Sequence, residues 1–298
     1  MAYHKASIAF FILYILVMTA LMIWLGLGIT PDRYVLMLTL GILFIGKTRK
    51  FLLDWLPFLF ILISYDFLRS LADHLNTRVH YLELIWADKW LFGVVPTVFL
   101  QEKLYFAGKL QWYDFVSVFF YFLHFALPLA FGFILWLKNR AYFKKFAVNL
   151  LVLSYAAFFT YVIFPASPPW LSNKMGLLPG VTKILENILK LFPQRLDLPT
   201  IYNNFDPNPV AAVPSLHAAY PFLVLLLSLK FFGKKALLFI PYILGVWFSI
   251  VYLGEHYVID VVLGVIYTLV TLLLTGFIHY HLPRLAKLKS FAVAKLLH

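Results

Sequence analysis

Two histidines and an aspartate stand where long apolar runs of this chain begin. His217 ends the tetrapeptide Pro214-Ser215-Leu216-His217, and His256 precedes Asp260 by four residues at the start of a later run. Ionisable groups at a membrane edge are costly, so each is a functional hypothesis by default. Residues four apart on a helix share a face, so a carboxylate can fix one imidazole nitrogen and leave the other as a nucleophile or base. The pattern indicates chemistry on a lipid.

The two histidines are expected to meet, although 38 residues separate them in the sequence. A short basic turn over 230–235 divides the intervening apolar stretch into two expected helices. One helix leads away from His217 and the next leads back toward His256. Both side chains therefore belong to the same membrane face.

Three other interpretations of these residues stay open. A membrane-edge histidine can satisfy backbone groups or reach for water. The set of His217, His256 and Asp260 could also ligate zinc or iron, although its spacing matches no zincin motif. A proton relay in a transporter is the third alternative.

The same residues carry a family resemblance over 164–264. Pro-Ser-Leu-His, followed by Tyr-Leu-Gly-Glu-His-Tyr-Val-Ile-Asp, resembles the second and third motifs of the type-2 phosphatidic acid phosphatase superfamily. The chain is most similar to the inositol phosphorylceramide synthase-like branch, because 168–170 read Pro-Pro-Trp and 208–212 read Asn-Pro-Val-Ala-Ala.

This resemblance implies a role for each residue. His256 would attack phosphorus and form a phosphohistidine, with Asp260 orienting it. His217 would protonate the leaving alcohol and later deprotonate the incoming one. Ser215 would donate a hydrogen bond to the phosphoryl oxygens or cap its helix. The resemblance implies no metal and no cofactor.

Two cations of the superfamily are missing from the chain. It has no Lys-x6-Arg-Pro motif, and Ile250 occupies the position of an arginine six residues before the nucleophile. A phosphoryl group in transit needs cationic donors, so other residues must supply them. Arg69 is the first candidate for phosphate binding and Lys174 the second. Arg69 could instead reach for head groups or pair with Asp66 or Asp73.

The composition is that of a polytopic membrane protein. Of the 298 residues 63% are hydrophobic and 13% charged, and the mean hydropathy is +0.86. The absence of cysteine excludes disulfides, thiolate catalysis and cysteine-bound metals. The net charge of +12 falls in short clusters between apolar runs, which is not the pattern of a nucleic-acid-binding face. The expected partners are membrane lipids, as donor and acceptor.

We predict an all-α transmembrane bundle of about eight spans with a six-helix catalytic core. Run lengths place the spans at 7–28, 33–46, 51–72, 114–137, 146–165, 214–230, 235–254 and 257–280. Residues 1–298 form one membrane domain in this prediction. It comprises N-terminal helices over 1–72, an interfacial segment over 73–113, a catalytic core over 114–280 that includes a cap over 166–213, and a basic tail over 281–298. One short helix is expected within the cap, over 182–192.

The basic residues predict the orientation. Fifteen of the 25 lysines and arginines fall in short connections and termini on one side: Lys5, Lys47, Arg49, Lys50, Lys138, Arg140, Lys144, Lys145, Lys230, Lys234, Lys235, Arg284, Lys287, Lys289 and Lys295. The positive-inside rule makes that side cytoplasmic. Both termini are then cytoplasmic, and the histidines face the periplasm, exterior or lumen.

The function predicted from the sequence is a metal-independent lipid phosphotransferase that moves a phospho-head group through a phosphohistidine. A lipid phosphate or polyprenyl diphosphate phosphatase is the alternative with the same chemistry. A transporter, or a structural membrane protein with relict motifs, is the alternative outside that class.

Overall fold

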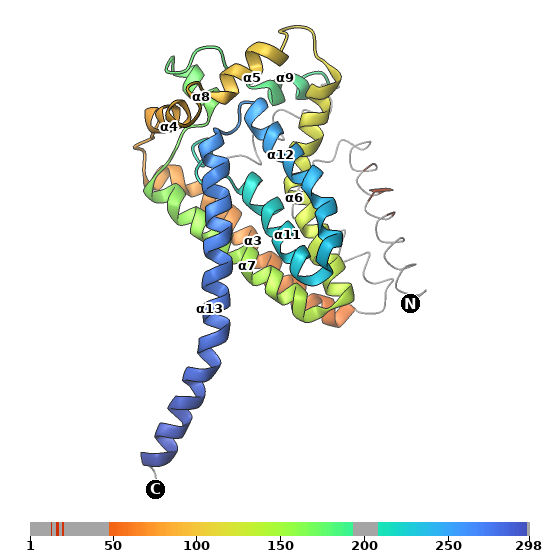
Figure 1. The fold of residues 1–298 in the computed structure, drawn as a ribbon, viewed down its shortest axis with the longest axis vertical. Helices are drawn as coiled ribbons and strands as arrows, with labels where there is room; N and C mark the ends of the chain where they lie inside the picture. Colours follow the sequence, from red (N-terminus) through yellow and green to blue (C-terminus); the bar gives the residue numbers. More distant parts are fainter. Residues whose placement is uncertain (1–12, 14–15, 18–19, 21–47, 193–207, 297–298) are drawn as a thin grey trace.

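The computed structural model describes residues 48–192 and 208–296, with a few isolated positions nearer the N-terminus, and it is helical throughout (Figure 1). The long helices are α3 (Thr48–Leu75), α6 (Trp112–Lys138), α7 (Arg140–Ile163) and α13 (Val258–Leu296). Between α7 and α13 come α11 (Leu216–Phe232), the 3-10 helix η2 (Gly233–Phe239) and α12 (Ile240–Tyr252). The short helices are α4 (Leu82–Phe92), α5 (Pro96–Leu104), α8 (Pro169–Lys174) and α9 (Ile184–Leu189). The predicted all-α class is confirmed.

Four of the described helices are long and apolar enough to cross a membrane: Lys50–Leu75, Trp112–Lys138, Arg140–Ile163 and Val258–His281. They coincide with the spans expected at 51–72, 114–137, 146–165 and 257–280. The spans expected at 7–28 and 33–46 lie outside the described residues. The protein is therefore an integral membrane protein, as its composition predicts.

Of the spans expected at 214–230 and 235–254, the first keeps its predicted length as α11 and the second is shorter than predicted as α12. α11 has 17 residues and α12 has 13, so neither reaches the roughly 20 residues of a typical span. Ser215 caps the start of α11 and Gly233 ends it, and η2 then takes the first five residues, 235–239, of the span expected at 235–254. The length of an apolar run does not distinguish a 3-10 turn from an α-helix, so the prediction overestimated α12.

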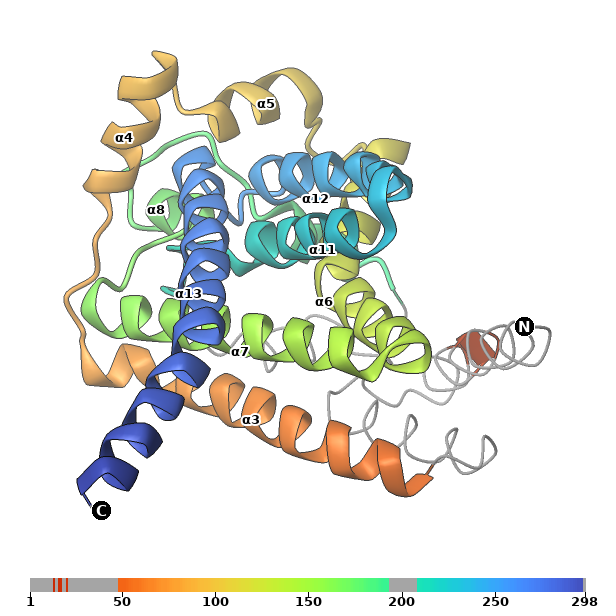
Figure 2. The same cartoon turned by 60° about the horizontal axis from the view of Figure 1, so that its bottom comes forward.

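α11 is the central helix of the bundle. It contacts α6, α7, α12 and α13, while α3 packs along the outer side of α7 (Figure 2). The side chains of Leu223 and Val224 are fully buried at the middle of α11. Stacked aromatic rings join α3 to α7, with the ring centroids of Trp55 and Phe143 4.9 Å apart.

A layer of short helices covers the end of the bundle where α11 and α13 begin (Figure 1). α4 and α5 come from the expected interfacial segment, and α8 and α9 come from the expected cap. α9 is the short helix predicted over 182–192, although it is limited to Ile184–Leu189. Isolated parallel bridges pair Ala166 with both His80 and Ala211, and so tie these segments together.

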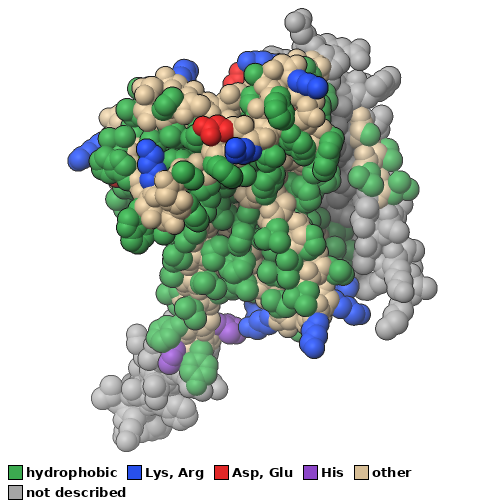
Figure 3. Space-filling view, turned by 45° about the horizontal axis from the view of Figure 1, so that its top comes forward, with side chains coloured by type: hydrophobic (Ala, Val, Ile, Leu, Met, Phe, Trp, Pro, Cys, Tyr) green, Lys and Arg blue, Asp and Glu red, His purple; other side chains and the backbone are tan. Residues whose placement is uncertain are grey.

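The surface separates apolar from charged side chains. Hydrophobic side chains cover the sides of the bundle, and lysines and arginines lie at both ends, including the end away from the short-helix layer (Figure 3). The exposed basic residues of that end are Lys138, Arg140, Lys144, Lys145, Lys230, Lys234 and Lys235. The basic connections and the two histidines therefore lie at opposite ends of the bundle.

Candidate active site

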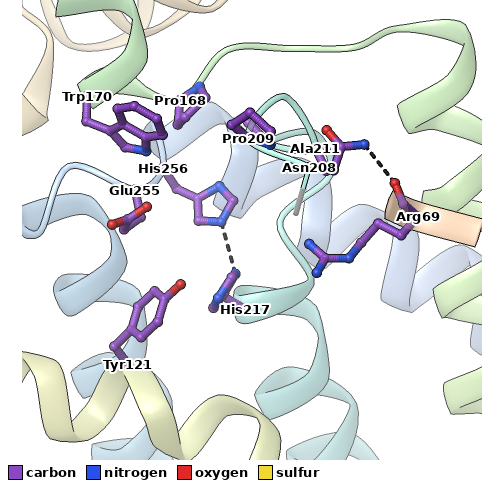
Figure 4. Close-up of a pocket in the computed structure, with 11 residues that line it drawn as sticks. Arg69, Tyr121, Pro168, Trp170, Asn208, Pro209, Ala211, His217, Glu255 and His256 are labelled. Carbon is purple, nitrogen blue, oxygen red and sulfur yellow. Dashed lines mark hydrogen bonds between the residues drawn. The ribbon is translucent and has the colours of Figure 1, made fainter. Parts of the chain in front are cut away.

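His217, His256 and Asp260 form one hydrogen-bonded chain. His217 lies in the first turn of α11, His256 in the turn between α12 and α13, and Asp260 in the first turn of α13. The Nδ1 atom of His256 lies 3.2 Å from Oδ2 of Asp260. Its Nε2 atom lies 3.1 Å from Nδ1 of His217, the bond drawn as a dashed line in Figure 4. The structure thus brings together the three residues that the sequence singled out.

The partners of His256 give its two nitrogens different roles. An ionised carboxylate only accepts hydrogen bonds, so Nδ1–H donates to Asp260 and Nε2 carries the lone pair. The same Oδ2 atom accepts the backbone N–H of Tyr257 at 2.9 Å. The His256 side chain is 6% exposed and that of Asp260 is fully buried. This arrangement places Nε2 at the pocket with its lone pair toward Nδ1 of His217, and a nitrogen in this state can act chemically as a nucleophile or base.

Two glycines allow this close approach. A Cβ atom at Gly264 would overlap with the carbonyl oxygen of Ser215, so only glycine lets α13 pass this close to the start of α11. The backbone N–H of Ser215 donates to the carbonyl oxygen of Asp260 at 3.1 Å at the same crossing. Gly254 has a φ of +84°, a left-handed conformation that turns the chain two residues before His256.

The short-helix layer holds the turn that carries His256. The carboxylate of Asp88, in α4, accepts the backbone N–H groups of Val258 at 3.1 Å and Ile259 at 2.9 Å. Thr97, in α5, donates its hydroxyl to the carbonyl oxygen of His256 at 3.4 Å. Asp88 therefore caps α13 from a distant part of the chain, because free N–H groups at a helix start need an acceptor.

Gln101, also in α5, links this layer to the end of α12. Its side-chain amide donates to the carbonyl oxygens of Tyr252 at 2.8 Å and Thr182 at 2.9 Å, and its Oε1 atom accepts the N–H of Thr182 at 2.7 Å. The turn from α12 to α13 is thus held at both ends by the segment before α6.

Burial sets the acidity of Asp88. Loss of solvent raises the pKa of this fully buried carboxyl from its ordinary 3.8 to about 6, and the nearby charge of Asp260 adds to the increase. The two backbone N–H groups oppose it, because they favour the ionised form.

A small pocket opens at the two histidines (Figure 4). Its lining comes from α3, α6, the cap and the two motifs: Arg69, Tyr121, Pro168, Trp170, Asn208, Pro209, Ala211, Ala212, His217, Glu255 and His256. The guanidinium of Arg69 points toward the histidines. The region expected to cap the membrane mouth therefore forms part of the pocket wall.

Arg69 fits both of the interpretations that the sequence left open. Its side chain lines the pocket and is 16% exposed, and it also pairs with Asp66 at 3.2 Å. Asn208 donates its side-chain amide to the carbonyl oxygen of Arg69 at 2.8 Å, which ties the end of α3 to the segment 208–212 that precedes the second motif. The arginine is thus held beside the histidines by groups on two segments.

The other two expected phosphate-binding residues lie outside the pocket lining. Ser215 is fully buried, and its hydroxyl oxygen accepts the N–H of Ala218 at 3.3 Å, so it caps α11. Lys174 is exposed at the last position of α8 and is not part of the lining. The structure brings neither side chain to His256.

Aromatic side chains of α6 pack against His217. The ring centroid of His124 lies 3.9 Å from that of His217, and the centroid of Tyr121 lies 4.8 Å from it. The Nδ1 atom of His124 bonds the carbonyl oxygen of Tyr121. His124, which belongs to neither sequence motif, therefore packs directly on a candidate catalytic side chain.

Metal ligation finds no support among the described residues. Over 48–192 and 208–296, no three His, Cys, Asp or Glu side chains are grouped as a metal site requires. His217 and His256 bond each other, and Nδ1 of His256 bonds Asp260. Independence from metals stays a prediction.

Comparison with known proteins assigns the family. The profile of the PAP2 superfamily matches residues 82–274, which is more than half of the chain. The chain belongs to the PAP2 superfamily. It is an enzyme of the PAP2 type, a phosphotransferase or a phosphatase, which confirms the resemblance read from the two motifs. The matched region begins at the first residue of α4, so it includes the layer that supports His256.

Curated relatives lie in the branch that the sequence resembles. The phosphoinositol dihydroceramide synthase of Bacteroides thetaiotaomicron is 31% identical over 82% of this chain and 82% of its own length. The inositol phosphorylceramide synthase catalytic subunit of Schizosaccharomyces pombe is 29% identical over 48% of this chain and 35% of its own length. Its counterpart in Saccharomyces cerevisiae is 31% identical over 39% of this chain and 30% of its own length. No solved structure matches the chain significantly.

Proposed function

We propose that this PAP2-superfamily enzyme transfers a phosphoinositol head group from a donor lipid to the hydroxyl group of a ceramide-type acceptor. The observation that carries the proposal is the hydrogen-bonded chain of His217, His256 and Asp260 at a pocket that also contains Arg69. The bacterial relative, which is similar over most of its length, is named for a phosphoinositol dihydroceramide product. The hydrogen-bonded chain and the name of the relative both support the transfer of a phosphorylated head group.

In the first step, Nε2 of His256 attacks the phosphorus atom of the donor. The bond between phosphorus and the diacylglycerol oxygen breaks, and a bond between phosphorus and Nε2 forms. In the free enzyme His217 bonds the attacking nitrogen at 3.1 Å; when the donor enters the pocket this bond is released, and His217, which lines the same pocket, gives a proton to the departing oxygen. Asp260 stabilises the positive charge that develops on the His256 ring.

In the second step, the acceptor alcohol gives its proton to His217 and attacks phosphorus. The bond between phosphorus and Nε2 then breaks and His256 is restored. Water would give hydrolysis by the same route, which is the phosphatase alternative. Because His256 is only 4% exposed, the enclosed site restricts water and favours an acceptor delivered by the membrane.

Arg69 is the proposed substitute for the missing superfamily cations. Its guanidinium points toward the histidines from α3, whereas the superfamily arginine would come from the position of Ile250. Ile250 is fully buried, and its carbonyl oxygen accepts the N–H groups of Glu255 and His256, so its side chain has no access to the substrate. An arginine fork suits the oxygens of a phosphoryl group.

The active site is proposed to face away from the cytoplasm. The pocket lies at the end of the bundle opposite the exposed basic connections, which the positive-inside rule assigns to the cytoplasm. The reaction would then use the lipids of the outer or lumenal leaflet.

Product analysis tests the function directly. Purified full-length protein is incubated in detergent micelles with phosphatidylinositol labelled in its head group, with and without ceramide or dihydroceramide. We expect a labelled sphingolipid only when the acceptor is present, and we expect the same yield after extensive treatment with EDTA. Release of free inositol phosphate regardless of acceptor would favour the phosphatase, and loss of activity restored by one metal would refute the metal-free mechanism.

A further inference from the structure

The charges of the pocket are divided between its two sides. Arg69 lies on one side of the paired histidines, and Glu255 lies on the other, between Trp170 and Tyr121 (Figure 4). Glu255 immediately precedes His256 and is 5% exposed. Its backbone N–H donates to the carbonyl oxygen of Ile250 at 3.1 Å, so its place beside the nucleophile is fixed by the turn.

Glu255 is a buried carboxylate in a pocket that is proposed to bind a phosphoryl group. It repels the phosphoryl oxygens, so the phosphoryl group is expected on the side of Arg69 and not beside Glu255. A carboxylate has about four acceptor positions, so it can take hydrogen bonds from a ligand as well as from a protein partner. The substrate group that reaches Glu255 must therefore donate hydrogen bonds or carry positive charge.

The surroundings of Trp170 favour neutral donors over a cation. A carboxylate beside aromatic rings could in principle receive an ammonium head group. However, the ammonium of Lys183 already lies over the Trp170 ring, 4.1 Å from its centroid. A second cation at this wall would be repelled, whereas hydroxyl groups would not.

We infer that Glu255, flanked by Trp170 and Tyr121, forms a subsite for the hydroxyl groups of the transferred head group and so selects polyol head groups. This inference rests on the proposed transferase function. The phosphoryl group would lie between His256 and Arg69, and the polyol ring would extend toward Glu255. Adjacent hydroxyl groups would donate to the carboxylate, and the aromatic side chains would pack on the ring.

A comparison of donors tests the subsite. Glu255→Gln keeps the size of the side chain but weakens its acceptors, and Glu102→Gln is a matched control on the exposed face of α5. Transfer is measured for the purified full-length protein in micelles of phosphatidylinositol, phosphatidylethanolamine or phosphatidylcholine. A hydrogen bond to a charged group contributes about 1.5–3 kcal/mol, so KM for phosphatidylinositol should rise roughly 10- to 100-fold in Glu255→Gln. We expect kcat to change less than KM, the KM for ceramide to stay unchanged, and Glu102→Gln to match the wild type.

Inhibition by soluble compounds gives a second readout. Free inositol 1-phosphate should inhibit the wild type more strongly than inorganic phosphate, and this preference should disappear in Glu255→Gln. Equal losses with all three donors, or a lower melting temperature with weaker inhibition by both compounds, would make Glu255 a structural residue and overturn the inference. A loss confined to phosphatidylcholine or phosphatidylethanolamine would assign the subsite to cations and overturn it as well.

The two proposals fail in different ways. If the wild type moves no head group from any donor to ceramide, the proposed function is wrong. If the wild type is active but Glu255→Gln does not discriminate among donors, only the polyol subsite is wrong.

Discussion

The imidazole of His256 is held from both sides, with Asp260 at Nδ1 and His217 at Nε2. Phosphoryl transfer through this ring predicts that His256→Ala loses at least roughly 10⁴-fold in turnover, as when the nucleophile of a catalytic triad is removed. Donor labelled in its head group should leave an acid-labile label on the wild-type protein and none on His256→Ala. His74→Ala is the control, because its side chain is 76% exposed and outside the pocket lining. Retention of both label and turnover in His256→Ala would refute the mechanism.

The fork of Arg69 is expected to matter as well as its charge. A lysine at this position keeps the charge but loses the paired N–H donors. Removal of one donor to a developing charge costs roughly 10²- to 10³-fold in turnover, so Arg69→Ala should lose that much and Arg69→Lys should also be impaired. Lys174→Ala, on the exposed end of α8, should keep normal rates. Near-normal turnover in both Arg69 variants would show that Arg69 does not bind the phosphoryl group, and its ion pair with Asp66 would then be a structural contact.

Sequence spacing could identify some residues of the site and not others. His256 and Asp260 are four residues apart, and a short turn returns the chain to His217, so local geometry predicts their contact. Asp88 contacts Val258 and Ile259 across about 170 residues of sequence, and no periodicity reports such a contact. Its one visible signal is a carboxylate within an apolar helix, which also fits an exposed interfacial residue.

At the scale of elements, the short-helix layer fixes the start of α13 through Asp88. Its pKa of about 6 lies above the ordinary 3.8, so the protonated form is favoured in the folded state. Protonated Asp88 therefore contributes to the free energy of unfolding. This contribution is fully present below about pH 4, is lost as the pH rises through about 6, and amounts to roughly 3 kcal/mol. Asp88→Asn has no such titration, so the melting temperature of the wild type should fall more between pH 4 and 7 than that of the variant. Parallel pH profiles for the two proteins would contradict the assigned pKa.

The crossing of α11 and α13 depends on Gly264. A methyl group there must displace the carbonyl oxygen of Ser215, which separates His217 from His256. Gly264→Ala should therefore reduce both turnover, by roughly 10-fold or more, and the melting temperature, because a 1 Å displacement in a reacting pair is costly. Gly276→Ala is a matched control further along α13, since a Cβ atom there would meet nothing within 4 Å. Equal behaviour of the two variants in activity and thermal unfolding would show that the crossing tolerates a side chain.

The helices themselves could be predicted better than their ends. Apolar runs of about 20 residues identified α3, α6, α7 and α13, because each side of these helices faces either lipid or the bundle. The same rule overestimated α12, since η2 occupies the first residues of the apolar run expected at 235–254. Capping and 3-10 geometry depend on single residues, and hydropathy averages over them.

At the scale of the whole molecule, charge is distributed along the axis of the bundle. The exposed lysines and arginines of the α6–α7 and α11–η2 connections lie at one end, and the pocket lies at the other. Because the positive-inside rule acts on short connections, this polarity predicts which leaflet supplies the substrates. The orientation could be predicted from the sequence, because the positive-inside rule requires only the order of the spans and the positions of the basic residues.

Labelling of single cysteines tests the orientation on which substrate access depends. The chain has no cysteine, so Lys174→Cys and Lys234→Cys each introduce the only thiol. Both positions are exposed, one in the short-helix layer near the pocket and the other at the basic end. In intact cells, an impermeant maleimide should label position 174 and spare position 234 until the membrane is opened by detergent. Labelling of 234 in intact cells, with 174 protected, would place the pocket in the cytoplasm and limit the enzyme to the lipids of the inner leaflet.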